Sequence, residues 1–465
     1  MKLLLLSGGS GKRLWPLSND ARSKQFLKVL TDPEGAMESM VQRVWRQLEV
    51  SGLIESAYVA TGKSQLDLLN SQLSQRAKII VEPERRDTFP AIALAATYLY
   101  SIVGVSLQEV ITILPVDPYV ELTFFDKIKE LEEMVLSSGA DLALIGVKPT
   151  YPSEKYGYIV PELTLGDQAA VSYTRVNHFR EKPNESQAEV LIRQQALWNC
   201  GVFAFKLDYI INQLQIRGYP IQYEALLQQY EFLPKISFDY EIVEQARHII
   251  VAPYEGGWKD LGTWNTLTEE MHEHLIGKGI IGVECENTHL INELPMPITV
   301  LGLSNVAVVA SSDGILVTDK AASPRIKDVM KHMEQRPMYE ERRWGWYRVL
   351  DYTRSEEKQE VMTKRVHIFQ GKNQSYQMHF KRSEVWTIIS GSGEFVLDGI
   401  FYPIKEGDVL AIPQGAIHAV LATTDMDVIE VQTGTELVEE DHVRIYMEWD
   451  DIVAHSLNHS LSKKA

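Results

Sequence analysis

A glycine-rich segment directly after an apolar run is the feature that most constrains this fold. The run Leu3–Leu6 is typical of a strand buried on both faces of a parallel sheet. It leads into Ser7-Gly8-Gly9-Ser10-Gly11, where glycines allow positive φ and a close approach of the backbone to a ligand. Successive N–H groups in such a loop form a concave anion site, and Lys12, Arg13 and Lys24 add positive charge. The segment therefore predicts a phosphate-binding loop.

The spacing of the glycines matches neither the G-x-x-x-x-G-K-[ST] motif nor the G-x-G-x-x-G motif. On the glycines alone, an ordinary turn between a strand and a helix is an equally good interpretation. The longer string from Gly8 to Ser18, followed by Ser23-Lys-Gln-Phe26, resembles the signature of sugar-1-phosphate nucleotidylyltransferases, and within them of mannose-1-phosphate guanylyltransferases. The resemblance implies that catalysis depends on Arg13 and Lys24. It also implies that the nucleotide binds to Ser7, Gly8, Gly9, Gly11 and Lys12.

Composition limits the class of protein. A chain of 465 residues is long for one core and suggests two or three domains. A net charge of −17 argues against a general nucleic-acid or anionic-membrane binder, and no run approaches the ~20 apolar residues of a membrane span. The two cysteines, Cys200 and Cys285, cannot form a disulfide framework, so we expect a cytoplasmic protein.

From residue 1 to 267, short apolar runs alternate with helical patterns. This alternation predicts a mostly parallel, Rossmann-like α/β sheet with helices on both faces. In such sheets ligands bind at the carboxyl ends of the strands. The runs are Ala57–Ala60, Lys78–Val81, Val110–Leu114 and Leu142–Ile145, with an alanine-rich helix at Pro90–Leu99.

Two carboxylates follow such runs. Glu82 can accept two parallel hydrogen bonds from the adjacent N1–H and N2–H of guanine, which adenine lacks, although a solvated acidic turn is the alternative. Asp117 at a strand tip suits Mg²⁺, although a helix cap or turn residue is the alternative. The family has comparable segments, which implies that Glu82 and Thr88 contact the base and that Asp117 binds the metal. Pro118 stands where the family has histidine.

The resemblance also implies the sugar-phosphate site and a second metal ligand. Glu181 and Lys182 are adjacent, so both can face one pocket only if the backbone turns there. The segment Gly256–Trp264 resembles the one whose aspartate, here Asp260, would share one Mg²⁺ with Asp117. The implied sugar-phosphate residues are Tyr156, Gly157, Glu181, Lys182 and Asn199.

The rest of the chain has a different pattern. Residues 268–337 contain short β-rich runs, for which the family has a β-helix-like module, and the stretch 321–335 predicts a connecting helix. Residues 338–465 have strands at short spacing, typical of a jelly-roll barrel.

Four residues of this last part form a candidate Zn²⁺-type site. Period-two alternation places Gln377 and His379 on one face of a strand, and Glu384 and His418 would complete the ligands. For any single histidine, a hydrogen-bonded core position is the alternative. The segment resembles the cupin motifs and the type II phosphomannose isomerase domain. It has Arg444-Ile-Tyr446 rather than the Tyr-Gly-Arg of that family.

The sequence therefore predicts three parts: a nucleotidyltransferase domain (1–267), a β-helix-like linker module (268–337) and a cupin barrel (338–465). The expected reaction joins GTP and mannose 1-phosphate into GDP-mannose and diphosphate, with Mg²⁺ as cofactor and a homodimer as the assembly. Three alternatives stay open: the same chemistry on another sugar 1-phosphate, an added isomerase activity, and a cupin that only senses sugar phosphate or dimerises.

Overall fold

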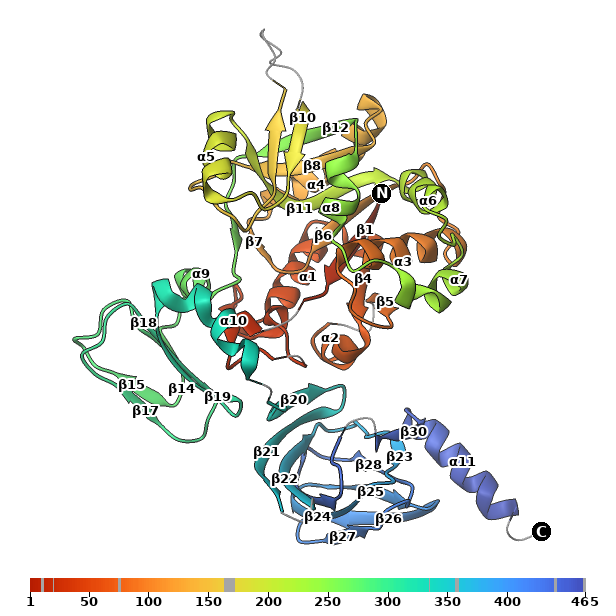
Figure 1. The fold of residues 1–465 in the computed structure, drawn as a ribbon. Helices are drawn as coiled ribbons and strands as arrows, with labels where there is room; N and C mark the ends of the chain where they lie inside the picture. The colour runs from red at the N-terminus through yellow and green to blue at the C-terminus, as the bar shows by residue number, and fades with distance from the viewer. Residues whose placement is uncertain are drawn as a thin grey trace.

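The computed structural model describes residues 1–9, 12–19, 21–73, 77–162, 172–333, 335–355, 359–438 and 441–462, with the side chains of residue 12 and residues 457–462 excepted. Figure 1 shows an α/β domain, a small β-module beside it and a barrel below both. None of the described helices is long and apolar enough to cross a membrane.

The α/β domain is built on a nine-stranded sheet in the order β5-β4-β1-β6-β11-β8-β12-β10-β9. Every strand except β10 and β11 runs in the same direction, because β11 is antiparallel to β6 and β8, and β10 is antiparallel to β12 and β9. The strands are β1 (Lys2–Ser7), β4 (Ala57–Gly62), β5 (Lys78–Glu82), β6 (Val110–Pro115), β8 (Leu142–Val147), β9 (Tyr158–Pro161), β10 (Thr174–Arg180), β11 (Leu197–Lys206) and β12 (Ile249–Tyr254). The predicted α/β fold with a mostly parallel sheet is confirmed.

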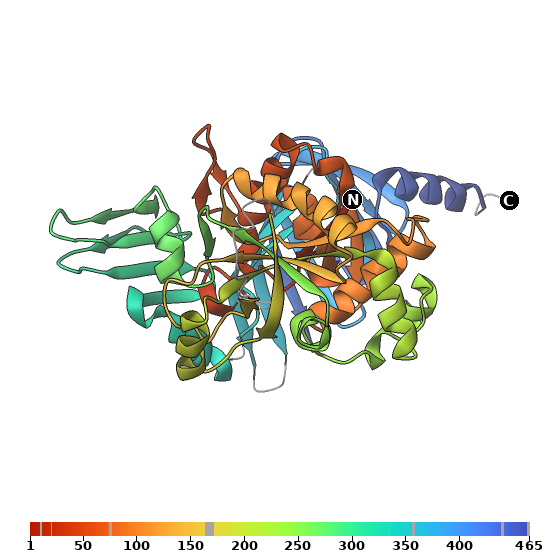
Figure 2. The same cartoon turned by 90° about the horizontal axis from the view of Figure 1, so that it is seen from above.

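Helices cover both faces of this sheet (Figure 2). One face packs against α1 (Met40–Val50), α2 (Leu66–Gln72), α4 (Thr123–Ser138) and α5 (Glu185–Arg193). The other packs against α3 (Thr88–Ser101), α6 (Leu207–Ile216), α7 (Tyr223–Gln228) and α8 (Phe238–Glu241). Strands β4 and β8 are buried along their whole length, and their sequences, Ala57–Ala60 in β4 and all of β8, are apolar without alternation.

The β-module consists of two short parallel ladders and one returning strand. Strands β14, β16 and β18 form one ladder, β15 and β17 form the other, and β19 pairs antiparallel with β18. This agrees with the expected β-helix-like pattern. The bounds are α9 (Trp264–Glu270), β14 (Leu275–Gly277), β15 (Gly279–Ile281), β16 (His289–Asn292), β17 (Ile298–Val300), β18 (Val306–Ser311) and β19 (Gly314–Asp319).

The single connecting helix predicted over 321–335 is wrong. The chain forms a 3₁₀ segment at Lys320–Arg325, then α10 (Ile326–Val329) and a further 3₁₀ turn at Met330–His332. Pro324 lies inside the first segment, and a proline has no N–H to donate to a regular helix.

The barrel is made of two facing sheets, and α11 (Trp449–Ser462) packs outside it. Their orders are β20-β21-β22-β29-β24-β27 and β26-β25-β28-β23-β30. The strands are β20 (Tyr339–Arg342), β21 (Gly345–Arg354), β22 (Glu360–Ile368), β23 (Tyr376–Met378), β24 (Arg382–Ser390), β25 (Ser392–Leu397), β26 (Ile400–Lys405), β27 (Val409–Ile412), β28 (His418–Ala422), β29 (Met426–Gly434) and β30 (Val443–Tyr446). The predicted barrel is confirmed.

Candidate active site and candidate metal centre

Lys24 lies between two aspartates that are far apart in the sequence. Its Nζ is 2.7 Å from Oδ2 of Asp117 and 2.8 Å from Oδ1 of Asp260. Strands β7 (Pro118–Val120) and β13 (Trp258–Asp260) form an antiparallel pair in which Asp260 is opposite Pro118. This short pair of strands places the two carboxylates next to each other, so both contact the same ammonium group of Lys24.

The charges of this cluster reinforce one another. Burial lowers the pKa of Lys24, but Asp117 and Asp260 outweigh burial and hold that pKa above its ordinary value. Burial raises the pKa of Asp260, but Lys24, Arg13 and Lys155 outweigh burial and keep that pKa below its usual range. Arg13 therefore lies near enough to act on Asp260, although its own side chain is exposed.

The glycine-rich loop follows β1 and contacts the segment that carries Lys24. Ser7 ends β1 and is buried, and Gly9 has a φ of 139°, in the region that favours glycine. Ser23 donates from Oγ to the Gly9 carbonyl at 3.0 Å. Two predicted nucleotide ligands, Gly11 and the side chain of Lys12, lie outside the described residues.

Glu82 lies at the end of β5 and is buried. Tyr230 donates from its hydroxyl to Oε2 of Glu82 at 2.7 Å. Burial raises the pKa of Glu82, against the opposing effects of Tyr230 and Arg85. Thr88 begins α3 and accepts a hydrogen bond at Oγ1 from the Phe238 amide at 2.8 Å, so this hydroxyl also supports the fold.

The backbone turns at Lys182. Such a turn is required if the adjacent side chains of Glu181 and Lys182 are to face the same pocket. Lys182 has a φ of 43°, and its Nζ lies 2.6 Å from Oε1 of Glu181. The other oxygen of Glu181, Oε2, is buried and has no hydrogen-bond partner among the described residues. Burial raises the pKa of Glu181, which Lys182 opposes. A buried acceptor of this kind suits a hydroxyl donor of a ligand.

Asp239 belongs to the same cluster and was missed by the sequence analysis. Asn199 donates from Nδ2 to Oδ1 of Asp239 at 2.8 Å and accepts at Oδ1 from the Gly201 amide at 3.0 Å. Burial and Glu181 raise the pKa of Asp239 to about 7. Asp239 lies in α8, a four-residue helix without a recognisable motif, so only its proximity to Asn199 reveals it.

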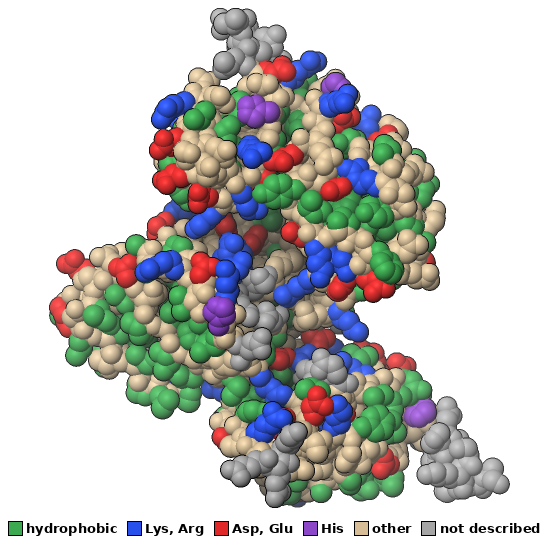
Figure 3. Space-filling model, in the orientation of Figure 1, with side chains coloured by type: hydrophobic (Ala, Val, Ile, Leu, Met, Phe, Trp, Pro, Cys, Tyr) green, Lys and Arg blue, Asp and Glu red, His purple; other side chains and the backbone are tan. Residues whose placement is uncertain are grey.

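Tyr156 lies in an aromatic group beside the aspartates. Its ring centroid is 4.8 Å from that of Trp198 and 5.4 Å from that of Trp258. These three side chains and Asp260 line a cavity of roughly 1140 Å³ between β8, β11 and α9. Figure 3 shows that Lys and Arg side chains gather around the hollow between the α/β domain and the parts below it.

In the barrel, His379, Glu384 and His418 converge within 4.8 Å of one another, and all three are buried. The Nδ1 atoms of His379 and His418 face the carbonyl oxygens of Asp441 and Ala416, each at 3.2 Å. Because these contacts hold the proton on Nδ1, both Nε2 atoms are acceptors near Glu384. Nε2 of His418 has no hydrogen-bond partner among the described residues, whereas Nε2 of His379 lies 3.3 Å from Nη2 of Arg382. The donor set therefore fits a zinc-type metal ion.

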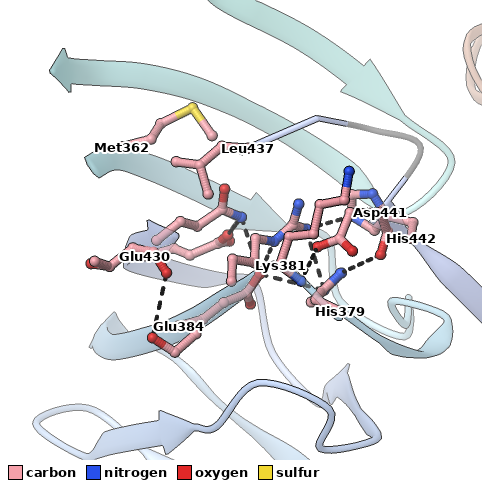
Figure 4. Close-up of polar contacts among 12 residues, drawn as sticks. Met362, His379, Lys381, Glu384, Glu430, Leu437, Asp441 and His442 are labelled. Carbon is pink, nitrogen blue, oxygen red and sulfur yellow. Dashed lines mark hydrogen bonds and ion pairs between the residues drawn. The ribbon is translucent and has the colours of Figure 1, made fainter. Parts of the chain in front are cut away.

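The predicted fourth ligand, Gln377, is opposite His418 on the neighbouring strand, and its Oε1 accepts from Ser375 at 2.8 Å. Arg382 donates to Glu384 at 2.9 Å and also contacts His442, which lies beside His379 and Asp441 in Figure 4. Burial and Glu384 raise the pKa of Glu430, on the adjacent strand, to about 7.

Two of the three parts thus carry a candidate site: the α/β domain has a lysine between two aspartates, and the barrel has a histidine–carboxylate cluster. The nucleotidyl transferase family model matches residues 2–275, and the mannose-6-phosphate isomerase C-terminal model matches residues 328–447. The chain belongs to the nucleotidyl transferase family.

Curated relatives resemble the chain along almost its whole length. It is 28% identical to the mannose-1-phosphate guanylyltransferase RfbM of Salmonella typhimurium over 95% of this chain and 96% of that one. It is 27% identical to the alginate biosynthesis protein AlgA of Pseudomonas aeruginosa, over 95% of each chain. A crystal structure from Thermus thermophilus, described as a mannose-1-phosphate geranyltransferase, superposes with a TM-score of 0.59 at 28% identity, covering 72% of this chain and 99% of that one.

Proposed function

We propose that this protein is a mannose-1-phosphate guanylyltransferase, which converts GTP and α-D-mannose 1-phosphate into GDP-mannose and diphosphate. The observation that carries the proposal is the position of Lys24 between Asp117 and Asp260, within the part of the chain that matches the nucleotidyl transferase family. Relatives with this activity in their names match over 95% of the chain.

The reaction needs charge neutralisation and positioning more than a protein nucleophile. A phosphate oxygen of the sugar phosphate attacks the α-phosphorus of GTP, and the bond from that phosphorus to the bridging oxygen of diphosphate breaks. Arg13, Ser7 and the amides of Gly8 and Gly9 hold the nucleotide phosphates. Lys24 neutralises the charge that develops in the transition state.

Asp117 and Asp260 are the residues that would hold Mg²⁺. Carboxylate oxygens are its preferred protein ligands, and both aspartates already share one cation, the ammonium of Lys24. When bound there, the ion would supply charge neutralisation between the two phosphate-bearing substrates.

Substrate selection depends on two buried carboxylates. Glu82, held by Tyr230, accepts from N1–H and N2–H of guanine, with Thr88 close by at the start of α3. Glu181, with Lys182 and Asn199, accepts from hydroxyl groups of the sugar.

The decisive experiment measures diphosphate release for every pairing of the four ribonucleoside triphosphates with mannose, glucose, galactose and heptose 1-phosphates. The proposal expects GTP with mannose 1-phosphate to be the best pair. A higher kcat/KM for another sugar 1-phosphate would keep the chemistry and refute the assigned sugar.

A second candidate activity, for the barrel, is the interconversion of mannose 6-phosphate and fructose 6-phosphate, which the match of residues 328–447 to the mannose-6-phosphate isomerase C-terminal model favours. His379, Glu384 and His418, with Gln377, would hold a Zn²⁺-type ion, and Glu430, on the strand beside Glu384, is the buried carboxylate that would move a proton between two sugar carbons. A coupled assay for fructose 6-phosphate formation tests this. Retained metal binding with no isomerisation would restrict the barrel to sensing or assembly.

A further inference from the structure

Arg22, two positions before Lys24, joins the segment that carries Lys24 to the β-module and to the barrel. Arg22 is 6% exposed, and its guanidinium donates to both carboxylate oxygens of Glu293, at 2.9 and 3.1 Å. Glu293 directly follows β16 of the β-module. On its other side the guanidinium lies 5.3 Å from the ring centroid of Tyr339, and its Nε is 3.8 Å from Oε1 of Glu341. Both of these residues are in β20, the first strand of the barrel.

A second link runs parallel to the first. Asn19 accepts at Oδ1 from the backbone amides of Ala21 and Arg22, at 2.9 and 2.7 Å, which closes the turn that precedes Arg22. The same side chain donates to Asp313 of the β-module at 2.6 Å. The other oxygen of Asp313 accepts from the Met338 amide at 2.6 Å, at the start of the barrel part.

Three consecutive residues thus face three different partners. Arg22 contacts the β-module and the barrel, Ser23 contacts the glycine-rich loop through Gly9, and Lys24 contacts the two aspartates. Consecutive Cα atoms are about 3.8 Å apart across a trans peptide. A displacement of Arg22 is therefore passed to Ser23 and Lys24.

We propose that Arg22 is a positioning residue for the transferase reaction, and that the contacts of Glu293 and β20 around its guanidinium set the place of Lys24. The inference rests on the transferase function proposed above. According to this inference, the barrel contributes to the transferase rate, because its residues Tyr339 and Glu341 help to hold Arg22 in place.

The first test replaces Arg22 in the full chain. Arg22→Gln removes the charge that Glu293 and Glu341 enclose, so Lys24 loses its fixed position. We expect kcat to fall about tenfold or more, because small misplacements of catalytic groups have effects of this size, while both KM values stay within about twofold. Rates are expressed per binding site, counted by titration with GTP, so that unfolded protein does not contribute.

Two variants serve as controls. Arg22→Lys keeps the charge but not the forked geometry, and should restore part of kcat. Arg193→Gln makes the same change at an exposed ion pair with Glu189 on α5, and should leave kcat unchanged.

The second test is a double-mutant cycle across the interface. Tyr339→Leu, a change in the barrel alone, should lower kcat in the wild-type background and have no further effect beside Arg22→Gln. If Arg22→Gln does not fold, Tyr339→Leu alone tests the proposal: a lowered kcat supports it, and a kcat equal to that of the wild type overturns it.

The outcomes separate the two proposals. If the wild type is active, any one of three results overturns the role of Arg22. These are an unchanged kcat in Arg22→Gln, additive effects in the double-mutant cycle, and a change confined to KM. A wild type that releases no diphosphate from any pair of substrates refutes the transferase function itself, and this inference with it.

Discussion

Gly157 lies so close to Glu181 that a β-carbon on Gly157 would stand 2.5 Å from Oε2 of that carboxylate and 2.6 Å from Cζ of Phe179. The Gly157 carbonyl also accepts from the Asn199 amide at 2.8 Å. Only glycine allows this approach, because Glu181 is buried and cannot withdraw into solvent. The glycine therefore fixes the place of the proposed sugar-hydroxyl acceptor.

Gly157→Ala tests this contact. The added methyl group should displace Glu181 and raise KM for mannose 1-phosphate on the order of tenfold, about the value of one hydrogen bond to a charged group, with KM for GTP unchanged. Steady-state kinetics with each substrate varied in turn gives both constants. Gly62→Ala, at a glycine with open space around its Cβ position, is the matched control. An equal rise for both substrates would argue against a local role.

Asp260→Ala should abolish most turnover while the protein still folds. The change removes one of the two carboxylates that face Lys24, so kcat should fall at least about 100-fold, as expected for a lost electrostatic contact in the transition state. The neighbouring exposed Lys259 provides the control Lys259→Ala. Near-normal diphosphate release from the Asp260 variant would refute the assigned role. The same result is expected for Arg13→Ala.

Glu82→Gln should weaken the preference for GTP over ATP. The variant keeps the shape of the side chain but replaces one acceptor with a donor, which conflicts with N1–H and N2–H of guanine. The ratio of kcat/KM values should drop by about 100-fold or more, the scale for a site built to hydrogen-bond its substrate. Glu84→Gln, at an exposed residue paired with Arg86, should leave that ratio as it is.

His289 makes the stability of the β-module depend on pH. Burial, Lys320 and His274 lower the pKa of His289 from 6.5 to about 3. Below pH 6.5 the imidazole of His289 is therefore protonated in the unfolded chain but stays neutral in the folded chain. The free energy of unfolding falls toward pH 3 by at most about 1.4 kcal/mol per pH unit. Above pH 6.5 both states are neutral and this contribution is constant.

The measurement follows thermal unfolding midpoints between about pH 7 and pH 4. His289→Gln should show a shallower decline than the wild type, whereas His272→Gln, at an exposed histidine, should follow the wild type. Parallel curves for all three proteins would contradict the prediction.

The barrel should take up about one equivalent of Zn²⁺ or a similar divalent ion per chain. His418→Ala removes a buried Nε2 that faces Glu384 and should reduce metal content at least about tenfold, a typical effect for the loss of one ligand or its partner. Elemental analysis after dialysis against the metal gives the content. His367→Ala, beside Asp427 elsewhere in the barrel, should retain the ion.

The sequence was most informative where a local rule applies. Leu3–Leu6, Val110–Leu114 and Leu142–Ile145 lie in strands because continuous apolar runs of that length must be buried on both faces. Glu82 lies at the end of β5 and Asp117 shortly after β6, because polar residues that follow such runs lie at the carboxyl ends of the strands. The turn at Lys182 followed from the requirement that two adjacent side chains face one pocket.

Pairings between distant segments were beyond this reasoning. The pair of β7 and β13 brings Asp117 to Asp260, and only the family resemblance indicated this meeting, because each strand is three residues long and has no pattern of its own. Asp239 and Arg22 were missed for a similar reason, because their importance depends on Asn199 in the first case and on Tyr339 and Glu293 in the second.

The hydrogen bonds that Asp313 accepts from Asn19 and Met338 have a consequence for protein engineering. A chimera joined at Pro337 would exchange the Met338 amide and β20 together, so a barrel grafted from a relative must supply its own partners for this buried carboxylate and for Arg22. A junction placed after β20, within the turn before Gly345, would keep these native contacts and is the better point at which to swap barrels.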